Sequence, residues 1–393
     1  MAPSFYNYLE RKKEEVVKVL QDLICIPSYE SELEVVDYLA QRLRKICLPF
    51  ESRKVTDKRA NISAYFGENG PSLILHSHTD TIPPGDIKKW KYNPFKAVVD
   101  NNRIYGLGAV DDKASLAAMV AVFEAVVLSG IDLKGRLTLM AVGGEEVGGL
   151  GTQAEIKSGV SADAVIVGEP TQLEVCIGHK GVFRYRIKVL GKACHASQPE
   201  EGINAISNAS RLVQALDSLG AELSKKIDPL LGSSSLTVTT ISGGKALNTI
   251  PGDCTIDIDR RLLLGEKKEE VEKEILFVLQ DLQKQDAQFR FESKLIRSIQ
   301  PAKVPPEEPL VQIMLDSVSK VKGRSCKPLG FKGCCDMGFF SNWAGIPGII
   351  CGPGSILRAH KINEFIAIED LKLAVEVYAN AIIRWFKVEQ RSG

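Results

Sequence analysis

The sequence predicts an α/β protein with a mostly parallel, mixed sheet flanked by helices, into which a second, α+β domain of the ferredoxin-like type is inserted. Two observations support this. Apolar runs of strand length alternate with helical patterns up to residue 178, which is typical of a parallel sheet covered by helices. Strands that alternate apolar and polar residues then follow, before a Pro-rich stretch at 301–309 returns the chain to buried patterns.

Each element of the first part has its own pattern. Helical spacing of apolar residues predicts helices over 14–24, which Pro27 terminates, over 32–47 and over 112–127. Short apolar runs bounded by turn residues predict strands over 61–66, 72–75, 103–105, 136–142 and 163–167.

The later elements follow from the same rules. Alternation predicts strands over 182–189, 235–241, 254–259 and 287–295, with amphipathic helices over 204–219 and 267–282 between them. Helices over 310–321 and 368–386 then surround a buried strand at 346–351. The expected boundaries are therefore 1–178 and 296–393 for the first domain, and 179–295 for the inserted one.

The net charge, the apolar stretches and the cysteine spacing argue against several classes of function. The 393 residues carry 50 Lys and Arg against 49 Asp and Glu, a net charge of +1 that offers no field for nucleic acid or an anionic membrane. No apolar stretch reaches transmembrane length, and we see no signal peptide at the N-terminus. Nine cysteines without CxxC spacing indicate reduced thiols, so we expect a cytoplasmic protein.

One stretch, 76–80 (His-Ser-His-Thr-Asp), directly follows a buried strand. His78 and Asp80 lie two residues apart, so in an extended segment both would point to the same side. A histidine and a carboxylate on one side suit a cation such as zinc. The alternative is a strand-end histidine that caps a turn, and this stretch alone does not decide between the two.

Further carboxylates and a histidine fall near the ends of other predicted strands. They are Asp111, Glu145, Glu146, Glu169 and His360. Gathered in one crevice, their negative charges would be costly unless cations neutralised them. In the Glu145-Glu146 pair one carboxylate can bind metal while the other serves as a general base, although a solvated acidic turn is the plainer interpretation of that pair.

Longer strings make a resemblance specific. His78-Thr-Asp80-Thr-Ile-Pro83-Pro-Gly-Asp86, Tyr105-Gly-Leu-Gly108-Ala-Val-Asp111-Asp-Lys113, Val167-Gly-Glu169-Pro-Thr171 and the segment from His360 to Asn363-Glu364-Phe365 occur in order. Together they resemble the M20 metallopeptidase family, and most of all its acetylornithine deacetylase / succinyl-diaminopimelate desuccinylase branch. The resemblance implies a catalytic domain with an inserted lid and dimerisation domain.

The resemblance also implies roles for single residues. His78 and Glu169 would hold one metal ion, Glu146 and His360 the other, and Asp111 would bridge two zinc ions, with cobalt or manganese as substitutes. Glu145 would be the general base and Asp80 would orient His78. We interpret the additional histidine, His76, as packed beneath the site.

In the inserted domain, His195 matches a histidine that stabilises the oxyanion, and Asn248 and Arg261 match positions that contact substrate. The neighbouring Arg260 leaves the choice of arginine open. His195, and an edge strand expected at 182–189, favour a homodimer through this domain.

We therefore expect a dinuclear-metal amidohydrolase acting on a small N-acylated amino acid. A dipeptidase or carboxypeptidase, or a succinyl-diaminopimelate desuccinylase, would share every catalytic residue. A non-catalytic binding protein of the same fold is the alternative from another class, but such a protein would be expected to lose Glu145 or a ligand, and all of them are present.

Overall fold

The chain forms two compact units in the computed structural model, which describes residues 4–388. The first unit runs up to Gly178 and resumes at Val304–Phe331 and from Cys335 onward, while the second comprises His179–Lys303 with Lys332–Cys334. The second unit ends at Lys303 rather than at residue 295, because its last long strand continues beyond Leu295.

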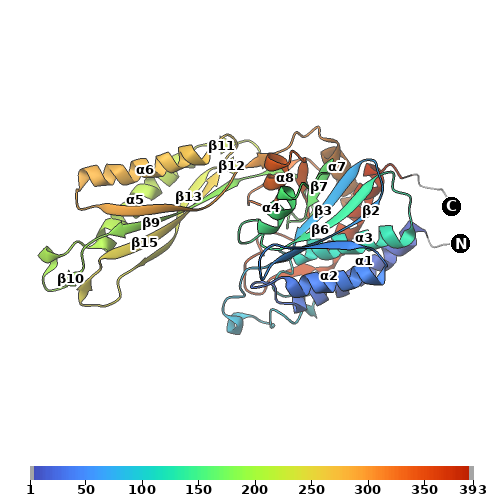
Figure 1. Ribbon diagram of the computed structural model, residues 1–393, viewed down its shortest axis with the longest axis horizontal. Helices are drawn as coiled ribbons and strands as arrows, with labels where there is room; N and C mark the ends of the chain where they lie inside the picture. The colour runs from blue at the N-terminus through green and yellow to red at the C-terminus, as the bar shows by residue number, and fades with distance from the viewer. Residues whose placement is uncertain (1–3, 389–393) are drawn as a thin grey trace. The chain divides into compact units, whose positions relative to one another are not determined.

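A mixed sheet forms the centre of the first unit (Figure 1). Its strands follow the order β1-β2-β6-β3-β7-β19-β8-β17, with β18 paired to β8; β17 is formed by the last two residues before the chain resumes the first unit at Val304. β3, β6, β7 and β19 run parallel to their neighbours within this group, whereas β1, β2 and β8 pair antiparallel. The bounds are β1 (Phe50–Lys54), β2 (Ala60–Gly67), β3 (Ser72–His78), β6 (Arg136–Val142), β7 (Ala164–Val167), β8 (Cys176–His179), β17 (Ala302–Lys303), β18 (Leu329–Phe331) and β19 (Gly348–Ile350).

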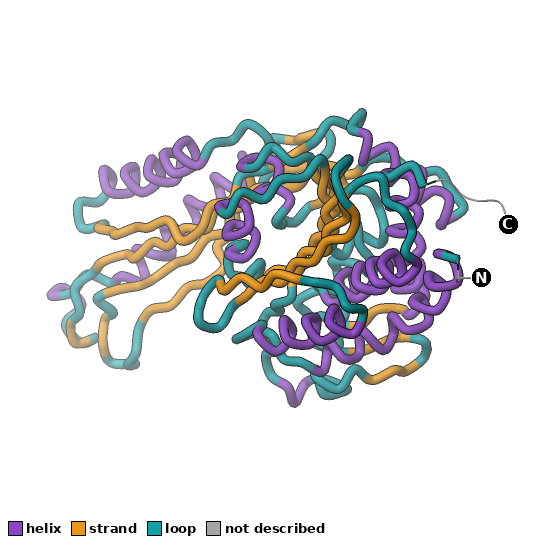
Figure 2. The backbone as a smooth tube through the Cα atoms, turned by 45° about the vertical axis from the view of Figure 1, so that its right-hand side comes forward, coloured by secondary structure: helices purple, strands orange, loops and turns teal. Residues whose placement is uncertain are grey.

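Helices cover both faces of this sheet (Figure 2). α3 packs on β3 and β6 and also contacts α1 and α9, while α8 contacts β7, β19 and α4. This confirms the predicted fold class. The helices are α1 (Phe5–Cys25), α2 (Leu33–Lys45), α3 (Lys113–Ser129), α4 (Leu150–Lys157), α7 (Pro309–Lys322), α8 (Met337–Trp343) and α9 (Ile368–Trp385).

A small second sheet in this unit joins distant parts of the chain. β5 (Arg103–Tyr105) lies between β4 (Val98–Asp100) and β20 (Phe365–Ala367). Tyr105 is paired with Phe365, which brings the turn after β5 next to the turn before β20. The predicted strand at 103–105 therefore belongs to this sheet and not to the central one.

The second unit is a four-stranded antiparallel sheet with two helices. The strand order is β13-β15-β9-β16, as in a ferredoxin-like α+β fold. The bounds are β9 (Gly181–Leu190), α5 (Ala205–Leu223), β13 (Ser235–Gly243), β15 (Asp253–Leu262), α6 (Lys268–Gln285) and β16 (Arg290–Ile299). Two-stranded pairs join β10 (Cys194–His195) to β14 (Thr249–Ile250), and β11 (Ile227–Asp228) to β12 (Gly232–Ser233).

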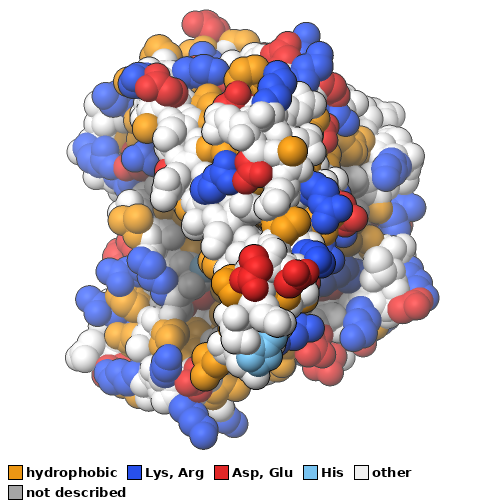
Figure 3. Space-filling view, turned by 90° about the vertical axis from the view of Figure 1, so that its left-hand side faces the viewer, with side chains coloured by type: hydrophobic (Ala, Val, Ile, Leu, Met, Phe, Trp, Pro, Cys, Tyr) orange, Lys and Arg blue, Asp and Glu red, His pale blue; other side chains and the backbone are white. Residues whose placement is uncertain are grey.

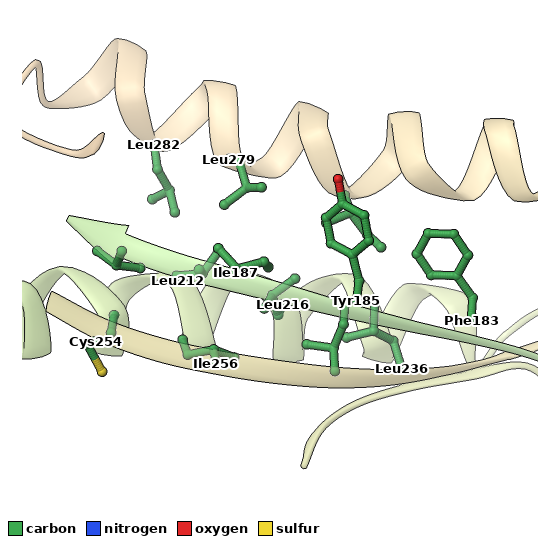
Figure 4. Packing of buried hydrophobic residues seen from close by; sticks show 14 of the residues in the cluster. Phe183, Tyr185, Ile187, Leu212, Leu216, Leu236, Cys254, Ile256, Leu279 and Leu282 are labelled. Atoms are coloured by element: carbon green, nitrogen blue, oxygen red, sulfur yellow. The ribbon is translucent and has the colours of Figure 1, made fainter. Parts of the chain in front are cut away.

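One face of that sheet carries both helices. Figure 4 shows Leu279 and Leu282 of α6 facing Ile187 of β9 and Leu212 of α5, all within a single buried cluster. Alternate residues of β9 belong to this cluster, so its amphipathic pattern is explained by one covered and one open face.

The expectation that 182–189 forms an edge strand is wrong. β9 lies between β15 and β16, and is hydrogen-bonded along both sides. The reason is topological, since both later strands pair with β9, and a strand's burial pattern reports its faces but not its neighbours.

Charged side chains of both signs are interspersed on the face of the molecule in Figure 3. On the second unit's sheet, Arg184 pairs with Asp259 at 3.0 Å and Arg186 with Asp257 at 2.6 Å. Within residues 4–388, none of the helices has both the length and the apolar character needed to cross a bilayer.

Candidate metal centre

The site begins where β3 ends. β3 is flanked by the parallel strands β6 and β7, so its carboxyl end meets theirs at one edge of the sheet. Beyond the strand, the Thr79 N–H donates to the Val142 carbonyl at 2.8 Å, which holds the turn onto the end of β6. His78 and Asp80 are therefore fixed, almost fully buried, at this edge.

Asp80 organises the turn that follows β6. Its Oδ1 accepts hydrogen bonds from the N–H groups of Gly144 at 2.9 Å and Glu145 at 3.0 Å, and its Oδ2 accepts from Glu146 at 3.0 Å. Burial raises the pKa of Asp80, but His78 and these backbone donors lower it more, so it stays below the ordinary value and the group is ionised. Asp80 thus positions the backbone of both glutamates.

His78 presents its second ring nitrogen to Asp111. Its Nδ1 lies 3.0 Å from the Asp80 carbonyl, which can only accept a hydrogen bond, so Nδ1 carries a proton. Its Nε2 lies 3.1 Å from Asp111 Oδ1. In a neutral imidazole this nitrogen carries a lone pair, which would face the carboxylate and be repelled by it. The arrangement therefore requires a proton or a metal ion between the two groups.

His360 makes the corresponding contacts on the other side of Asp111. Its Nε2 lies 2.7 Å from Glu146 Oε1 and 3.4 Å from Asp111 Oδ2. These two carboxylates raise the pKa of His360 to about 10, more than burial lowers it. The stabilisation of positive charge at this nitrogen marks a place where a cation is favoured.

Two sets of potential ligands share one aspartate. His78, Asp111 and Glu169 offer ligand atoms that all lie within 4.8 Å of one another, and Asp111, Glu146 and His360 do the same. Burial, followed by the negative charge of Asp111, raises the pKa of Glu169 well above its ordinary value. A histidine and two carboxylates in each set fit a divalent ion such as zinc, and the charge they concentrate fits two ions.

Glu145 lies next to this cluster in a buried environment. Burial raises the pKa of Glu145 well above its ordinary value, and the negative charges of Asp336 and Glu146 add to the effect. A carboxylate with a raised pKa beside a metal site has the property required of a group that accepts and returns a proton.

Glu364, four residues after His360, also contributes to the site, although the sequence pattern does not predict a role for it. It is 2% exposed and its carboxylate accepts hydrogen bonds from the N–H groups of Gly108, Val110 and Asp111. Burial raises the pKa of Glu364 to about 8, against the effect of these donors. The only sequence signal was an acidic residue beside an apolar strand, close to His360.

His76 lies beneath the site, as expected. Its Nε2 is 2.8 Å from the Thr152 hydroxyl, which in turn donates to Asp336 at 2.6 Å, and its ring packs edge-on against Phe340. Burial lowers the pKa of His76 to about 3, so it is neutral. It belongs to neither ligand set.

The remaining predicted residues lie in the second unit. His195 and Asn248 are brought together there, because His195 pairs with Thr249 and the Asn248 carbonyl accepts the Ala196 N–H at 2.9 Å. The Ser197 N–H donates to His195 Nδ1 at 3.2 Å, so the neutral ring carries its proton on the exposed Nε2.

The structure also separates the two adjacent arginines. Arg260 is fully buried and bound to Glu266 at 2.7 Å, on the helix-covered side of β15. Arg261 is partly exposed on the open side and pairs with Asp259 at 2.7 Å. Arg261 is therefore the one available to a ligand.

A mixed sheet with two ligand sets at its edge, sharing one aspartate and adjoined by a buried glutamate, defines a metal-dependent hydrolase. The chain belongs to peptidase family M20/M25/M40, whose family model matches residues 74–384. This confirms the family resemblance seen in the sequence.

Similar proteins agree with this assignment. The chain is 28% identical over 369 residues to an acetylornithine deacetylase of Buchnera aphidicola, covering 91% of this chain and 94% of that protein. Its fold is that of an M20 family metallo-carboxypeptidase from Sulfolobus solfataricus, with a TM-score of 0.81, 21% identity, and coverage of 95% and 99% of the two chains. Human carnosine dipeptidase 1 has a TM-score of 0.82 at 15% identity, with coverage of 98% and 100%.

Proposed function

We propose that this protein hydrolyses the amide bond of a small N-acylated amino acid, in the manner of an acetylornithine deacetylase. The observation that carries this proposal is the pair of ligand sets joined at Asp111 with Glu145 beside them. The substrate class is supported by the deacetylase relatives, which match this chain over almost their whole length.

Each residue has a proposed part in the reaction. His78, Asp111 and Glu169 would hold one zinc ion, and Asp111, Glu146 and His360 the other, with cobalt or manganese as possible substitutes. When bound, the two ions would supply the Lewis acidity that polarises an amide carbonyl and activates water.

Glu145 would take a proton from the attacking water and deliver it to the nitrogen of the leaving amine. Asp80 would hold Glu145 and Glu146 in position by accepting hydrogen bonds from their backbone N–H groups. His195 would donate from Nε2 to the oxyanion of the tetrahedral intermediate, and Asn248 and Arg261 would bind the substrate, Arg261 through a carboxylate.

A substrate panel tests the substrate class. Zinc- or cobalt-loaded protein is assayed with acetyl-ornithine, acetyl-citrulline, succinyl-diaminopimelate and simple dipeptides. We expect the acetylated amino acids to be cleaved with the highest kcat/KM. Preferential cleavage of dipeptides or of the succinyl compound would refute the deacetylase proposal while leaving the metal chemistry intact.

Glu145→Gln tests the chemistry separately from the substrate. We expect hydrolysis to fall by about 10²–10⁴-fold because proton transfer is lost, while two ions remain bound. Glu68→Gln, on the exposed turn after β2, is the matched control and is expected to retain activity. An active Glu145→Gln variant would show that the base has been assigned wrongly.

We also propose that the protein is a cytoplasmic homodimer that associates through its second unit. The buried Cys176, Cys254 and Cys351 are free thiols, in keeping with a reducing compartment. The edges of the second unit's sheet are β13 and β16, so an extension of the sheet by a second copy would involve one of these strands. Sedimentation at micromolar concentration is expected to give a dimer, and a monomer there would contradict the proposal.

A further inference from the structure

Glu364 binds the whole turn that carries Asp111. Its Oε1 accepts from Val110 N–H at 2.7 Å and Asp111 N–H at 3.1 Å, and its Oε2 accepts from Gly108 N–H at 3.1 Å. The backbone carbonyl of Glu364 also accepts the Gly106 N–H at 3.1 Å. A single residue therefore fixes four N–H groups of the segment 106–111.

Both carboxylate oxygens are used by these contacts, so Glu364 is not one of the clustered ligands. It is nevertheless a buried polar side chain, and burying such a group is costly unless it is hydrogen-bonded. An apolar residue could fill the same space without that cost. The carboxylate is thus explained by the backbone donors it binds.

The position of Glu364 in the chain links two ligands. His360 lies four residues earlier on the same turn, where His360 and Asn363 have left-handed backbone conformations with φ of 59° and 63°. Glu364 connects this turn to the Asp111 turn, and the pairing of Phe365 with Tyr105 continues the connection. The separation of Asp111 from His360 therefore depends on Glu364.

The other ligands do not depend on it in the same way. His78 ends β3 and Glu169 follows β7, two hydrogen-bonded parallel strands of the central sheet. In the set formed by Asp111, Glu146 and His360, Asp111 is hydrogen-bonded to Glu364 and His360 lies four residues from it in the chain, whereas the other set contains only Asp111.

We propose that Glu364 is a positioning residue that sets the affinity of the Asp111, Glu146 and His360 set for its metal ion. The inference rests on the two-metal assignment made above, and it is independent of which amide is the substrate. This role distinguishes the two ions, since loss of Glu364 would weaken the binding of the ion at Asp111, Glu146 and His360 much more than the binding of the other ion.

Metal titration tests this directly. Metal-free wild type, Glu364→Gln and Glu364→Asp are titrated with Zn²⁺ in a calorimeter. We expect two ions to bind wild type, and one of them to bind each variant 10–100-fold more weakly, the range found when groups that orient metal ligands are lost. Glutamine has the size of glutamate but only one acceptor oxygen, and aspartate has both oxygens on a shorter side chain. If Glu364 positions the Asp111 turn, both variants should therefore bind the ion more weakly.

The control is Glu266→Gln, which alters a carboxylate that accepts the Leu263 N–H in the second unit and is expected to leave both affinities unchanged. Wild-type affinity for both ions in Glu364→Gln, or equal weakening of both, would overturn this inference alone. A wild type that binds fewer than two ions would instead overturn the proposed function.

A measurement on wild type covers the case in which neither variant folds. Amide hydrogen exchange of the metal-free protein is expected to be slow at Gly106, Gly108, Val110 and Asp111, because these four N–H groups are bonded to Glu364. Fast exchange of this segment in folded protein would refute the positioning role.

Discussion

Replacing Asp80 by asparagine removes one acceptor from the three backbone N–H groups that fix the Glu145-Glu146 turn. The amide oxygen can still accept from Gly144 and Glu145, but the NH₂ group then faces the Glu146 N–H, and two donors oppose each other. A hydrogen bond to an ionised group contributes about 1.5–3 kcal/mol. The variant is expected to unfold with a free energy lower by about 2–3 kcal/mol, since one such bond is lost and the others become neutral.

The effect on catalysis follows from the same contacts. Glu146 is a proposed ligand and Glu145 the proposed base, so a shift of this turn disturbs both. We expect kcat/KM to fall by about 10–100-fold, as for other groups that orient metal ligands, which corresponds to about 1.4–2.7 kcal/mol.

Steady-state kinetics and urea unfolding measure the two effects. Asp163→Asn is the matched control, because its carboxylate accepts the Ser72 N–H at 2.7 Å at the opposite end of β3 and is exposed. This control is expected to keep full activity. If Asp80→Asn also retained kcat/KM within twofold of wild type, the idea that Asp80 positions the glutamate turn would be wrong.

Three further predictions concern stability. Chelation of bound metal is expected to lower the melting temperature, and zinc to restore it, because an ion at 100 times its Kd stabilises the folded state by about 2.7 kcal/mol; no shift in a thermal melt would argue against resident ions. His179 is buried and its pKa is lowered to about 4, so below pH 6.5 the unfolded state binds a proton that the folded state does not, and stability is lost as the pH falls. Measured by urea unfolding, the free energy of unfolding should fall between pH 7 and pH 5 by about 2 kcal/mol more in wild type than in His179→Gln. Equal decreases in the two proteins would contradict this. Lys113 donates to the Leu23 and Ile26 carbonyls at 2.9 and 2.8 Å at the end of α1, so Lys113→Met is expected to lower the unfolding free energy by about 1–3 kcal/mol; an unchanged urea midpoint would refute this.

The sequence was most informative about the residues of the candidate site, because several of their positions follow from strand ends. His78 ends β3, Glu145 follows β6 and Glu169 follows β7. Parallel strands finish at a common edge, so local patterns were enough to bring these three groups together before any distance was known.

Contacts between residues far apart in the sequence could not be predicted from local patterns. Glu364 lies 254 residues from Val110, and nothing in either segment indicates the other. The central position of β9 could not be predicted for a similar reason, because a strand at the edge of the sheet would show the same alternating burial. The short strand β1 and the short helices α4 and α8 were not predicted at all, since few residues carry their patterns.

The two arginines are an intermediate case. Ile256, Ile258 and Arg260 fall on the same face of β15 by simple alternation, and that face is covered by helices. The alternation was visible in the sequence, but which face the helices covered was not. Only with that knowledge can Arg261 be identified as the partly exposed member of the pair.

The two points at which the chain leaves and re-enters the first unit are adjacent, since the Val304 N–H donates to the Ile177 carbonyl at 2.8 Å. The segment 179–303 can therefore be exchanged at one place without separating any two side chains of the two candidate ligand sets. Because the proposed substrate-binding residues Asn248 and Arg261 lie in this segment, its exchange offers a way to alter substrate selectivity while the central sheet stays unchanged.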